Sequence, residues 1–189
     1  MKRSFPSNAV VGAAGENLVL SHLLRLNYIA GLAPYNTKDY DLIILSEDEA
    51  VAKSIQVKTA LFTDEIRTTD YKWILNKKHE TDINNLIFCF VSMSTKSSDN
   101  KIYVMDSKKV SEVTKMSHRI YLKLPGMKGQ THNESSMRIM SSNYLSLVTN
   151  KKNVNKIQEY LDSNELDFLE KHSEGWLEKY LDNWGILDE

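Results

Sequence analysis

The chain has 189 residues, of which 41% are hydrophobic and 26% charged, a composition that excludes a disordered or fibrous protein. No run reaches the roughly 18 apolar residues of a membrane helix, and the first residues lack an apolar signal core, so we expect a cytoplasmic protein without membrane contact. The single cysteine, Cys89, lies in an apolar run and excludes an intramolecular disulfide framework.

The net charge of -1 hides an uneven distribution. Residues 1–158 carry 22 Lys and Arg against 15 Asp and Glu, a net +7, whereas residues 159–189 carry 2 against 10, a net -8. A basic body suits a polyanion such as nucleic acid, although an ordinary solvated surface also carries an excess of this size. We expect one domain over residues 1–158 and an acidic helical tail over 159–189. The tail packs on the domain, forms a dimer contact or competes with nucleic acid for the basic face.

The first predicted element is a helix that starts at Pro6-Ser7-Asn8 and runs through Arg25, with apolar residues at helical spacing. Gly12 and Gly15 weaken this helix, since glycine costs roughly 1 kcal/mol relative to alanine. We therefore expect another group to approach the helix backbone closely beside Glu16.

Strands are predicted for the short apolar and β-branched runs bounded by turn residues. Two of them, 40–46 and 50–61, flank Glu47-Asp48-Glu49 and predict a hairpin with a charged turn. The other predicted strands are 28–33, 86–93, 102–105 and 120–124, with a short helix between 106 and 116 and a loop over 126–143. The spacing of Trp176, Leu177, Tyr180, Leu181 and Trp184 predicts an amphipathic C-terminal helix.

The hairpin brings polar residues together. A turn centred near residue 48 or 49 pairs residues whose numbers sum to about 97 to 99, so Asp41 lies across from residues 56–58. Because side chains alternate along a strand, Gln56 and Lys58 share a face and Val57 points the other way. Polar groups that converge on an apolar hairpin need an explanation, because burying them without partners is costly.

These residues resemble a known family. Gly15-Glu16 on a first helix, followed by the segments 40–44 (YDLII) and 55–59 (IQVKT), look like the core of the PD-(D/E)xK nuclease superfamily, which includes restriction enzymes, Holliday-junction resolvases and some homing endonucleases. The resemblance implies an α/β, restriction-endonuclease-like fold, in which helices flank a central mixed β-sheet, here with a C-terminal helical tail. It also implies the order α-β-β-β-α-β, which requires residues 72–84 to be helical.

The resemblance implies a role for each residue of the motif. Asp41 matches the metal-binding aspartate, Lys58 the catalytic lysine and Glu16 the acidic residue of the first helix. Gln56 stands where the family usually has a second carboxylate, a departure that occurs in an active branch and in degenerate relatives. The backbone carbonyl of Val57 would be a further metal ligand.

This donor set suits Mg²⁺ or Mn²⁺, because hard cations prefer oxygen ligands, and a divalent ion assists phosphodiester hydrolysis. Lys58 would either orient or deprotonate the attacking water or stabilise the transition state. The resemblance therefore implies a metal-dependent endonuclease acting on DNA, with RNA as an alternative substrate. The competing interpretation is an inactive, nuclease-like nucleic-acid-binding or assembly protein.

Basic residues elsewhere are candidate contacts to a phosphate backbone, namely Lys77, Lys78, Lys108 and Lys109. A solvated basic patch explains the same residues. A homodimer is a further expectation, because an enzyme that cuts both strands at one site often acts as a dimer.

Overall fold

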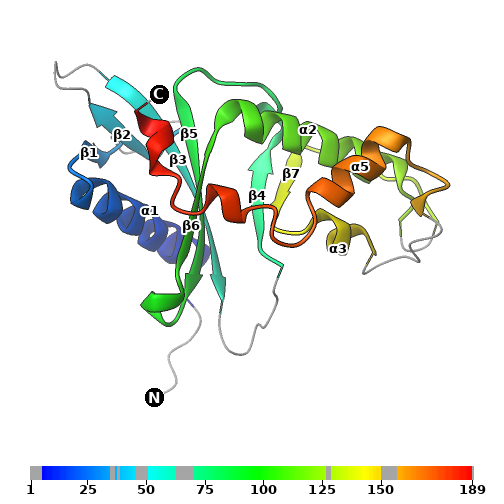
Figure 1. Ribbon diagram of the computed structural model, residues 1–189, viewed down its shortest axis with the longest axis horizontal. Helices are drawn as coiled ribbons and strands as arrows, with labels where there is room; N and C mark the ends of the chain where they lie inside the picture. The colour runs from blue at the N-terminus through cyan, green and yellow to red at the C-terminus, as the bar shows by residue number, and fades with distance from the viewer. Residues whose placement is uncertain are drawn as a thin grey trace. The chain divides into compact units, whose positions relative to one another are not determined.

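The structure is a computed structural model that describes residues 6–34, 37, 39–45, 51–62, 70–126, 129–149 and 157–188, with the backbone alone at 51 and 52 (Figure 1). By its internal contacts the chain divides into two units. The first comprises residues 1–67, 84–107 and 180–189, and the second comprises residues 68–83 and 108–179. The expected division into one domain over residues 1–158 and an acidic helical tail over residues 159–189 stays a prediction.

The first unit is built on a five-stranded mixed sheet in the order β1-β2-β3-β5-β6. Strands β3 and β5 are parallel, and the other neighbours are antiparallel. The strands are β1 (Ile29–Leu32), β2 (Leu42–Leu45), β3 (Val51–Phe62), β5 (Leu86–Ser94) and β6 (Lys101–Asp106). The predicted α/β fold with a central mixed sheet is confirmed.

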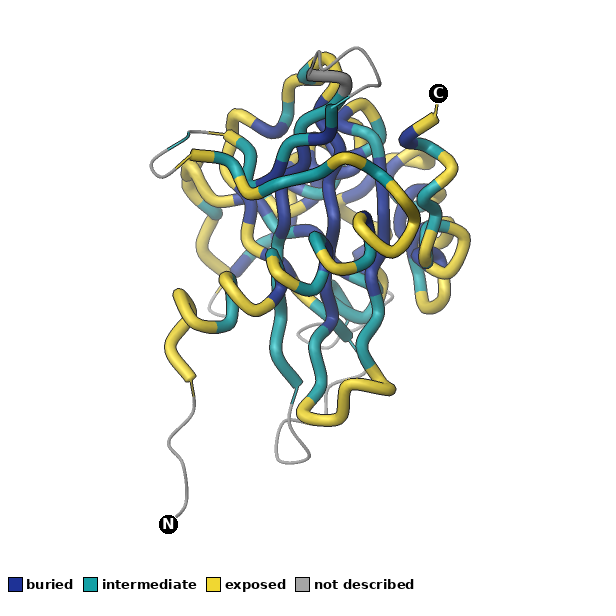
Figure 2. The backbone as a smooth tube through the Cα atoms, turned by 90° about the vertical axis from the view of Figure 1, so that its left-hand side faces the viewer, coloured by how far each residue is buried: buried dark blue, intermediate teal, exposed yellow. Residues whose placement is uncertain are grey.

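Helix α1 (Asn8–Arg25) precedes the sheet and begins where the sequence predicts. The Ser7 side chain accepts a hydrogen bond from the backbone N–H of Val10 at 3.4 Å, as an N-cap residue does. The helix ends before Asn27, whose φ of 66° is left-handed. Figure 2 shows buried and exposed residues alternating along α1, consistent with one face packed on the sheet.

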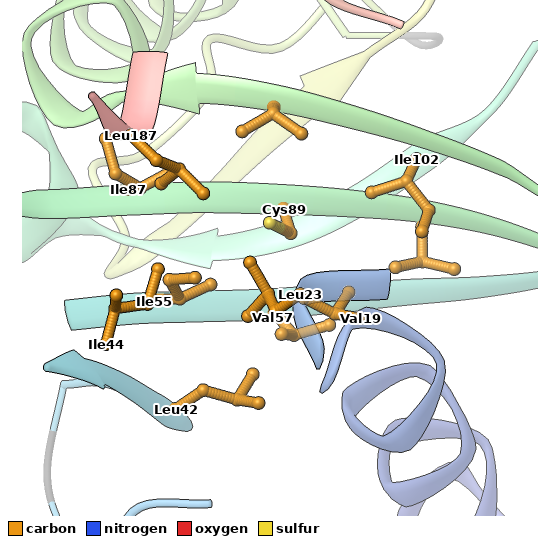
Figure 3. Packing of buried hydrophobic residues seen from close by; sticks show 12 residues of the cluster. Val19, Leu23, Leu42, Ile44, Ile55, Val57, Ile87, Cys89, Ile102 and Leu187 are labelled. Atoms are coloured by element: carbon orange, nitrogen blue, oxygen red, sulfur yellow. The ribbon is translucent and has the colours of Figure 1, made fainter. Parts of the chain in front are cut away.

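The core of the first unit lies between α1 and one face of the sheet (Figure 3). Val19 and Leu23 of α1 are fully buried in a cluster with apolar residues of β2, β3, β5 and β6 and with Leu187, and Ala30 of β1 packs against this cluster. Leu187 belongs to the 3-10 turn η4 (Trp184–Leu187). On β3 this face carries Ile55 and Val57, so Gln56 and Lys58 point to the opposite face.

The second unit contains a two-stranded antiparallel sheet, β4 (Lys72–Asn76) with β7 (Met137–Ser141). Its helices are α2 (Ser107–Lys123, of which Ser107 belongs to the first unit), α3 (Tyr144–Thr149) and α5 (Ser163–Lys171), with 3-10 turns η1 (Lys77–Glu80) and η3 (Glu178–Tyr180). A further 3-10 turn, η2 (Ser97–Asp99), precedes β6 in the first unit. Over the described residues, none of these helices is long and apolar enough to cross a membrane.

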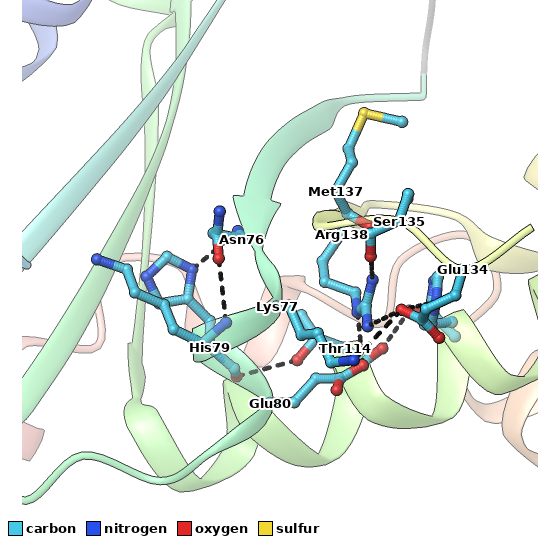
Figure 4. A network of polar contacts seen from close by, with 12 residues as sticks. Asn76, Lys77, His79, Glu80, Thr114, Glu134, Ser135, Met137 and Arg138 are labelled. Carbon is cyan, nitrogen blue, oxygen red and sulfur yellow. Dashed lines mark hydrogen bonds and ion pairs between the residues drawn. The ribbon is translucent and has the colours of Figure 1, made fainter.

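A buried arginine organises the polar interior of the second unit (Figure 4). The Arg138 guanidinium donates to Glu80 at 2.5 Å, to Glu134 at 2.9 Å and to the backbone oxygen of Ser135 at 2.6 Å. Desolvation opposes the charge of Arg138, but these carboxylates outweigh it and raise its pKa. This network ties β7 to η1.

Three local predictions for the second unit are wrong. Residues 72–84 form β4 and η1 rather than a helix, because Trp73 and Leu75 alternate with exposed neighbours and Asn76 caps the 3-10 turn. Residues 120–123 complete α2 rather than forming a strand, and Leu124 directly follows the helix. Ile120 and Leu124 are four residues apart and both are buried, which is a helical spacing. The predicted loop 126–143 contains β7, which pairs with β4 across more than sixty residues.

The predicted helix through Trp176 and Trp184 is also wrong. The chain makes turns and short 3-10 segments there, since Gly175 and Asp182 adopt φ values of 84° and 49°, which an α-helix does not tolerate. The backbone N–H of Asp182 bonds the carbonyl of Ile102 at 2.9 Å. The apolar spacing therefore reflects separate buried contacts and not one helix face.

Candidate active site

The hairpin pairs as its sequence predicts. Leu42 lies opposite Ile55, and the backbone N–H of Asp41 donates to the carbonyl of Ile55 at 2.7 Å. Asp41 is the last residue before β2 and lies across from Gln56. The predicted register is therefore confirmed, with an irregularity between Ile44 and Leu45. The predicted charged turn, Glu47-Asp48-Glu49, lies outside the described residues.

The Asp41 carboxylate is held by two donors from β3. Its Oδ2 atom accepts the backbone N–H of Val57 at 2.7 Å and the side-chain amide N–H of Gln56 at 3.2 Å. Asp41 is partly exposed, whereas Gln56 is 7% exposed. The carboxylate thus has a fixed position at the start of β2.

The Gln56 side chain carries a buried oxygen atom beside the Asp41 carboxylate. A carboxylate only accepts hydrogen bonds, so the Gln56 amide must turn its nitrogen toward Asp41. Its Oε1 atom is then buried without a hydrogen-bond partner among the described residues. A buried polar atom of this kind carries a desolvation cost of about 1–3 kcal/mol, which a bound cation would offset.

The Val57 carbonyl faces the same edge. In an extended strand the N–H and C=O of one residue point to the same side, and the N–H of Val57 points to Asp41. Strand β2 begins only at Leu42, so it does not extend alongside Val57. The carbonyl is therefore directed toward the predicted site.

Glu16 reaches this group of residues from α1. Burial raises the pKa of its carboxyl group, the nearby charge of Asp41 raises it further, and Lys58 lowers it. Glu16 therefore lies within the range at which the charges of Asp41 and Lys58 act on it. Two neighbouring carboxylates repel each other, and a divalent cation between them would relieve that repulsion.

Lys58 is half-buried on the same face of β3 as Gln56. Its effect on Glu16 indicates that the ammonium group lies within reach of the carboxylates. Hydrogen bonds therefore join Asp41 to Gln56 and Val57, and Glu16 lies near enough to Asp41 and Lys58 for their charges to affect its pKa.

The donor set fits a hard divalent cation. It offers two carboxylates, a buried amide oxygen with no protein partner among the described residues, and a backbone carbonyl. In the part of the chain that the structure describes, no three His, Cys, Asp or Glu side chains form a metal-binding group. The fit therefore depends on Gln56 and Val57 as well as on the acidic residues.

Thr59 is the last residue of the motif segment 55–59, and the sequence predicts no role for it. Its hydroxyl is buried without a hydrogen-bond partner among the described residues, directly against Gly15. The signal was present in the sequence, since a helix glycine before Glu16 predicted a close approach. The expectation is confirmed for Gly15, whereas a Cβ atom at Gly12 would meet nothing within 4 Å.

The four lysines predicted to bind nucleic acid all lie in the second unit. Lys77 pairs with Glu134 at 3.7 Å, and Lys109 pairs with Glu112 at 3.8 Å. Lys78 and Lys108 are exposed on η1 and α2. At neutral pH Lys77 and Lys109 are thus partly neutralised by carboxylates of their own unit.

Comparison with known proteins finds no matching family model and no matching curated protein. Among solved structures, the bacterial homing endonuclease I-Ssp6803I matches with 14% sequence identity and a TM-score of 0.41. The match covers 56% of this chain and 70% of that chain. Because the similarity is partial, we base the function on the residues of the site itself.

Proposed function

We propose that this protein is a divalent-metal-dependent endonuclease that hydrolyses phosphodiester bonds in DNA. The observation that carries the proposal is the buried Oε1 atom of Gln56, which has no protein partner among the described residues and lies on an amide fixed by Asp41. A cation bound beside the two carboxylates and the lysine would satisfy this oxygen.

In this proposal Asp41, Gln56, Glu16 and the Val57 carbonyl hold Mg²⁺ or Mn²⁺. The bound ion would supply Lewis acidity toward a phosphate oxygen and lower the pKa of a bound water. The hydrogen bond from Val57 keeps the Asp41 carboxylate oriented before any ligand arrives. Lys58 would either orient the attacking water or stabilise the negative charge that develops on the phosphate.

The test incubates the pure protein with supercoiled plasmid, branched DNA and RNA, with Mg²⁺, Mn²⁺ or a chelator. We expect DNA cleavage that requires the metal. Lys58→Gln and Asp41→Asn should reduce cleavage by about a hundredfold or more, while Lys96→Gln, an exposed lysine of the same unit, leaves it unchanged. Cleavage of RNA alone would identify RNA as the substrate in place of DNA. Metal binding without cleavage would favour the interpretation as an inactive nucleic-acid-binding protein.

We further propose that Lys77, Lys78, Lys108 and Lys109 contact the phosphate backbone. Each lost contact should weaken binding to every DNA sequence alike. It should also reduce the slope of the logarithm of the binding constant against the logarithm of the salt concentration by about one. The matched control is Lys171→Ala, because Lys171 is exposed in the same unit and pairs with Asp167 at 2.7 Å. An unchanged slope in the four single variants would remove these lysines from the interface.

A further inference from the structure

We infer that Gly15 is a positioning residue, whose missing side chain lets α1 rest directly on Thr59 of β3 and so holds Glu16 beside Asp41. The inference rests on the proposed function in one respect, because it takes Glu16 to be a metal ligand. It adds a residue that touches neither metal nor substrate.

The helix and strand approach too closely for any side chain at position 15. A Cβ atom built on Gly15 would overlap Oγ1 of Thr59 outright and would lie 2.9 Å from its Cβ and 3.0 Å from its Cγ2. The Thr59 Cβ atom is attached to the backbone of β3, so rotating its side chain does not remove the conflict. Alanine at position 15 must therefore push α1 away from the strand.

The chain accepts two unfavourable features at this contact. Glycine in a helix interior costs roughly 1 kcal/mol relative to alanine, and the Thr59 hydroxyl is buried without a hydrogen-bond partner among the described residues. Alanine at 15 and valine at 59 would remove both costs if packing were the sole requirement. Their joint presence indicates that the close approach itself is needed.

Glu16 is the next residue on the same helix, and the charges of Asp41 and Lys58 both affect the pKa of its carboxyl group. A shift of α1 away from β3 carries Glu16 with it. Because displacements of about 1 Å at a reacting centre cost about a hundredfold in rate, a methyl group at position 15 would disturb the site without changing any of its functional groups.

The experiment measures Mn²⁺ affinity by calorimetry and thermal stability in the same set of variants. Gly15→Ala should weaken Mn²⁺ binding about as much as Glu16→Gln, by roughly ten- to a hundredfold. In the Glu16→Gln background the same substitution should have no further effect on affinity, because the ligand it displaces is already gone. A purely structural role for Gly15 would lower affinity equally in both backgrounds and would overturn the inference.

Two further variants secure the interpretation. Thr59→Gly removes every side-chain atom of Thr59 that meets the added Cβ, so the double variant Gly15→Ala/Thr59→Gly should recover folding and most of the Mn²⁺ affinity even where Gly15→Ala alone does not fold. Gly12→Ala, on the same helix with open space, should raise the melting temperature and leave affinity unchanged. A double variant that stays as impaired as Gly15→Ala would overturn the inference.

Failure of the proposed function gives a different pattern. A wild-type protein that binds no Mn²⁺ contradicts the metal site, and the melting temperatures still decide whether Gly15 and Thr59 form the helix contact. A wild-type protein that binds Mn²⁺ independently of Glu16 retains the metal site and overturns the inference about Gly15.

Discussion

Asp41 and Val57 are joined by a 2.7 Å hydrogen bond from the backbone N–H of β3 to the carboxylate at the start of β2. The bond gives Asp41 two separable roles. Its oxygen satisfies a backbone donor of the central strand, and its charge serves a cation. Substitutions that keep the first role and remove the second distinguish them.

Asp41→Asn should leave stability close to that of the wild type, because an amide oxygen can still accept from Val57, and it should weaken Mn²⁺ binding at least tenfold through the lost charge. Asp41→Ala also leaves the Val57 N–H without its partner, so its free energy of unfolding should be about 1–3 kcal/mol lower than that of the wild type. Thermal denaturation and calorimetry measure the two effects. Full metal affinity in Asp41→Asn would exclude Asp41 as a ligand.

Gln56→Glu should make the protein more dependent on metal. Without metal the new carboxylate faces Asp41 in place of the amide N–H that now donates to it at 3.2 Å, so the melting temperature should fall. With metal the extra negative charge should maintain or tighten binding, and the melting temperature should recover by ligand linkage. Melting curves with chelator and with Mg²⁺ provide the measurement, and loss of metal binding would remove Gln56 from the coordination shell.

Acid should destabilise the second unit through His172. Burial among Phe168, Tyr144 and Trp176 lowers its pKa from 6.5 to about 4. The hydrogen bond with the backbone carbonyl of Phe168 opposes this decrease, Lys109 and Lys179 add to it, and Asp167 opposes it. The folded state therefore keeps His172 neutral while the unfolded state binds a proton below pH 6.5. Stability is complete above that pH and falls toward pH 4, with a slope of at most about 1.4 kcal/mol per pH unit.

Urea denaturation at a series of pH values measures this slope, with His172→Phe as the comparison. The variant removes the titrating group while keeping an aromatic ring in the cluster. Its stability should vary less than that of the wild type between pH 6.5 and 4. Parallel curves for the two proteins would show that other groups cause the acid sensitivity.

Glu165→Gln should destabilise the packing of α5 on α2. The Glu165 side chain is fully buried and binds Arg119 at 2.8 Å and Lys123 at 2.6 Å. The amide keeps the shape but loses the charge, and both cations stay near solvent, so we expect a loss of about 1–3 kcal/mol in the free energy of unfolding. Thermal denaturation in low and high salt gives the value, and an unchanged protein would show that the ion pairs contribute nothing. The control is Asp167→Asn, because Asp167 forms an exposed pair with Lys171.

The sequence alone determined the hairpin and the residues that it gathers. Neighbouring strands joined by a short charged turn have their register fixed by the turn, so Asp41 and Gln56 had to face each other. The start of α1 at Ser7 and the buried strand β5 follow from equally local signals. The need for a close approach at Gly15 also showed in the sequence, since a helix seldom retains glycine without a reason.

Only the tertiary structure decided which segment covers Gly15, and how residues 72–76 and 137–141 fold. A five-residue run with alternating burial becomes a strand only when a distant strand supplies its hydrogen-bond partners. The residues within the run do not identify that distant strand. The same holds for the unsatisfied oxygen of Gln56, because burial is a property of the assembled chain. Local hydrogen bonding and the periodic spacing of apolar side chains can be predicted from the sequence. Long-range strand pairing and the burial of polar atoms arise only when the chain folds.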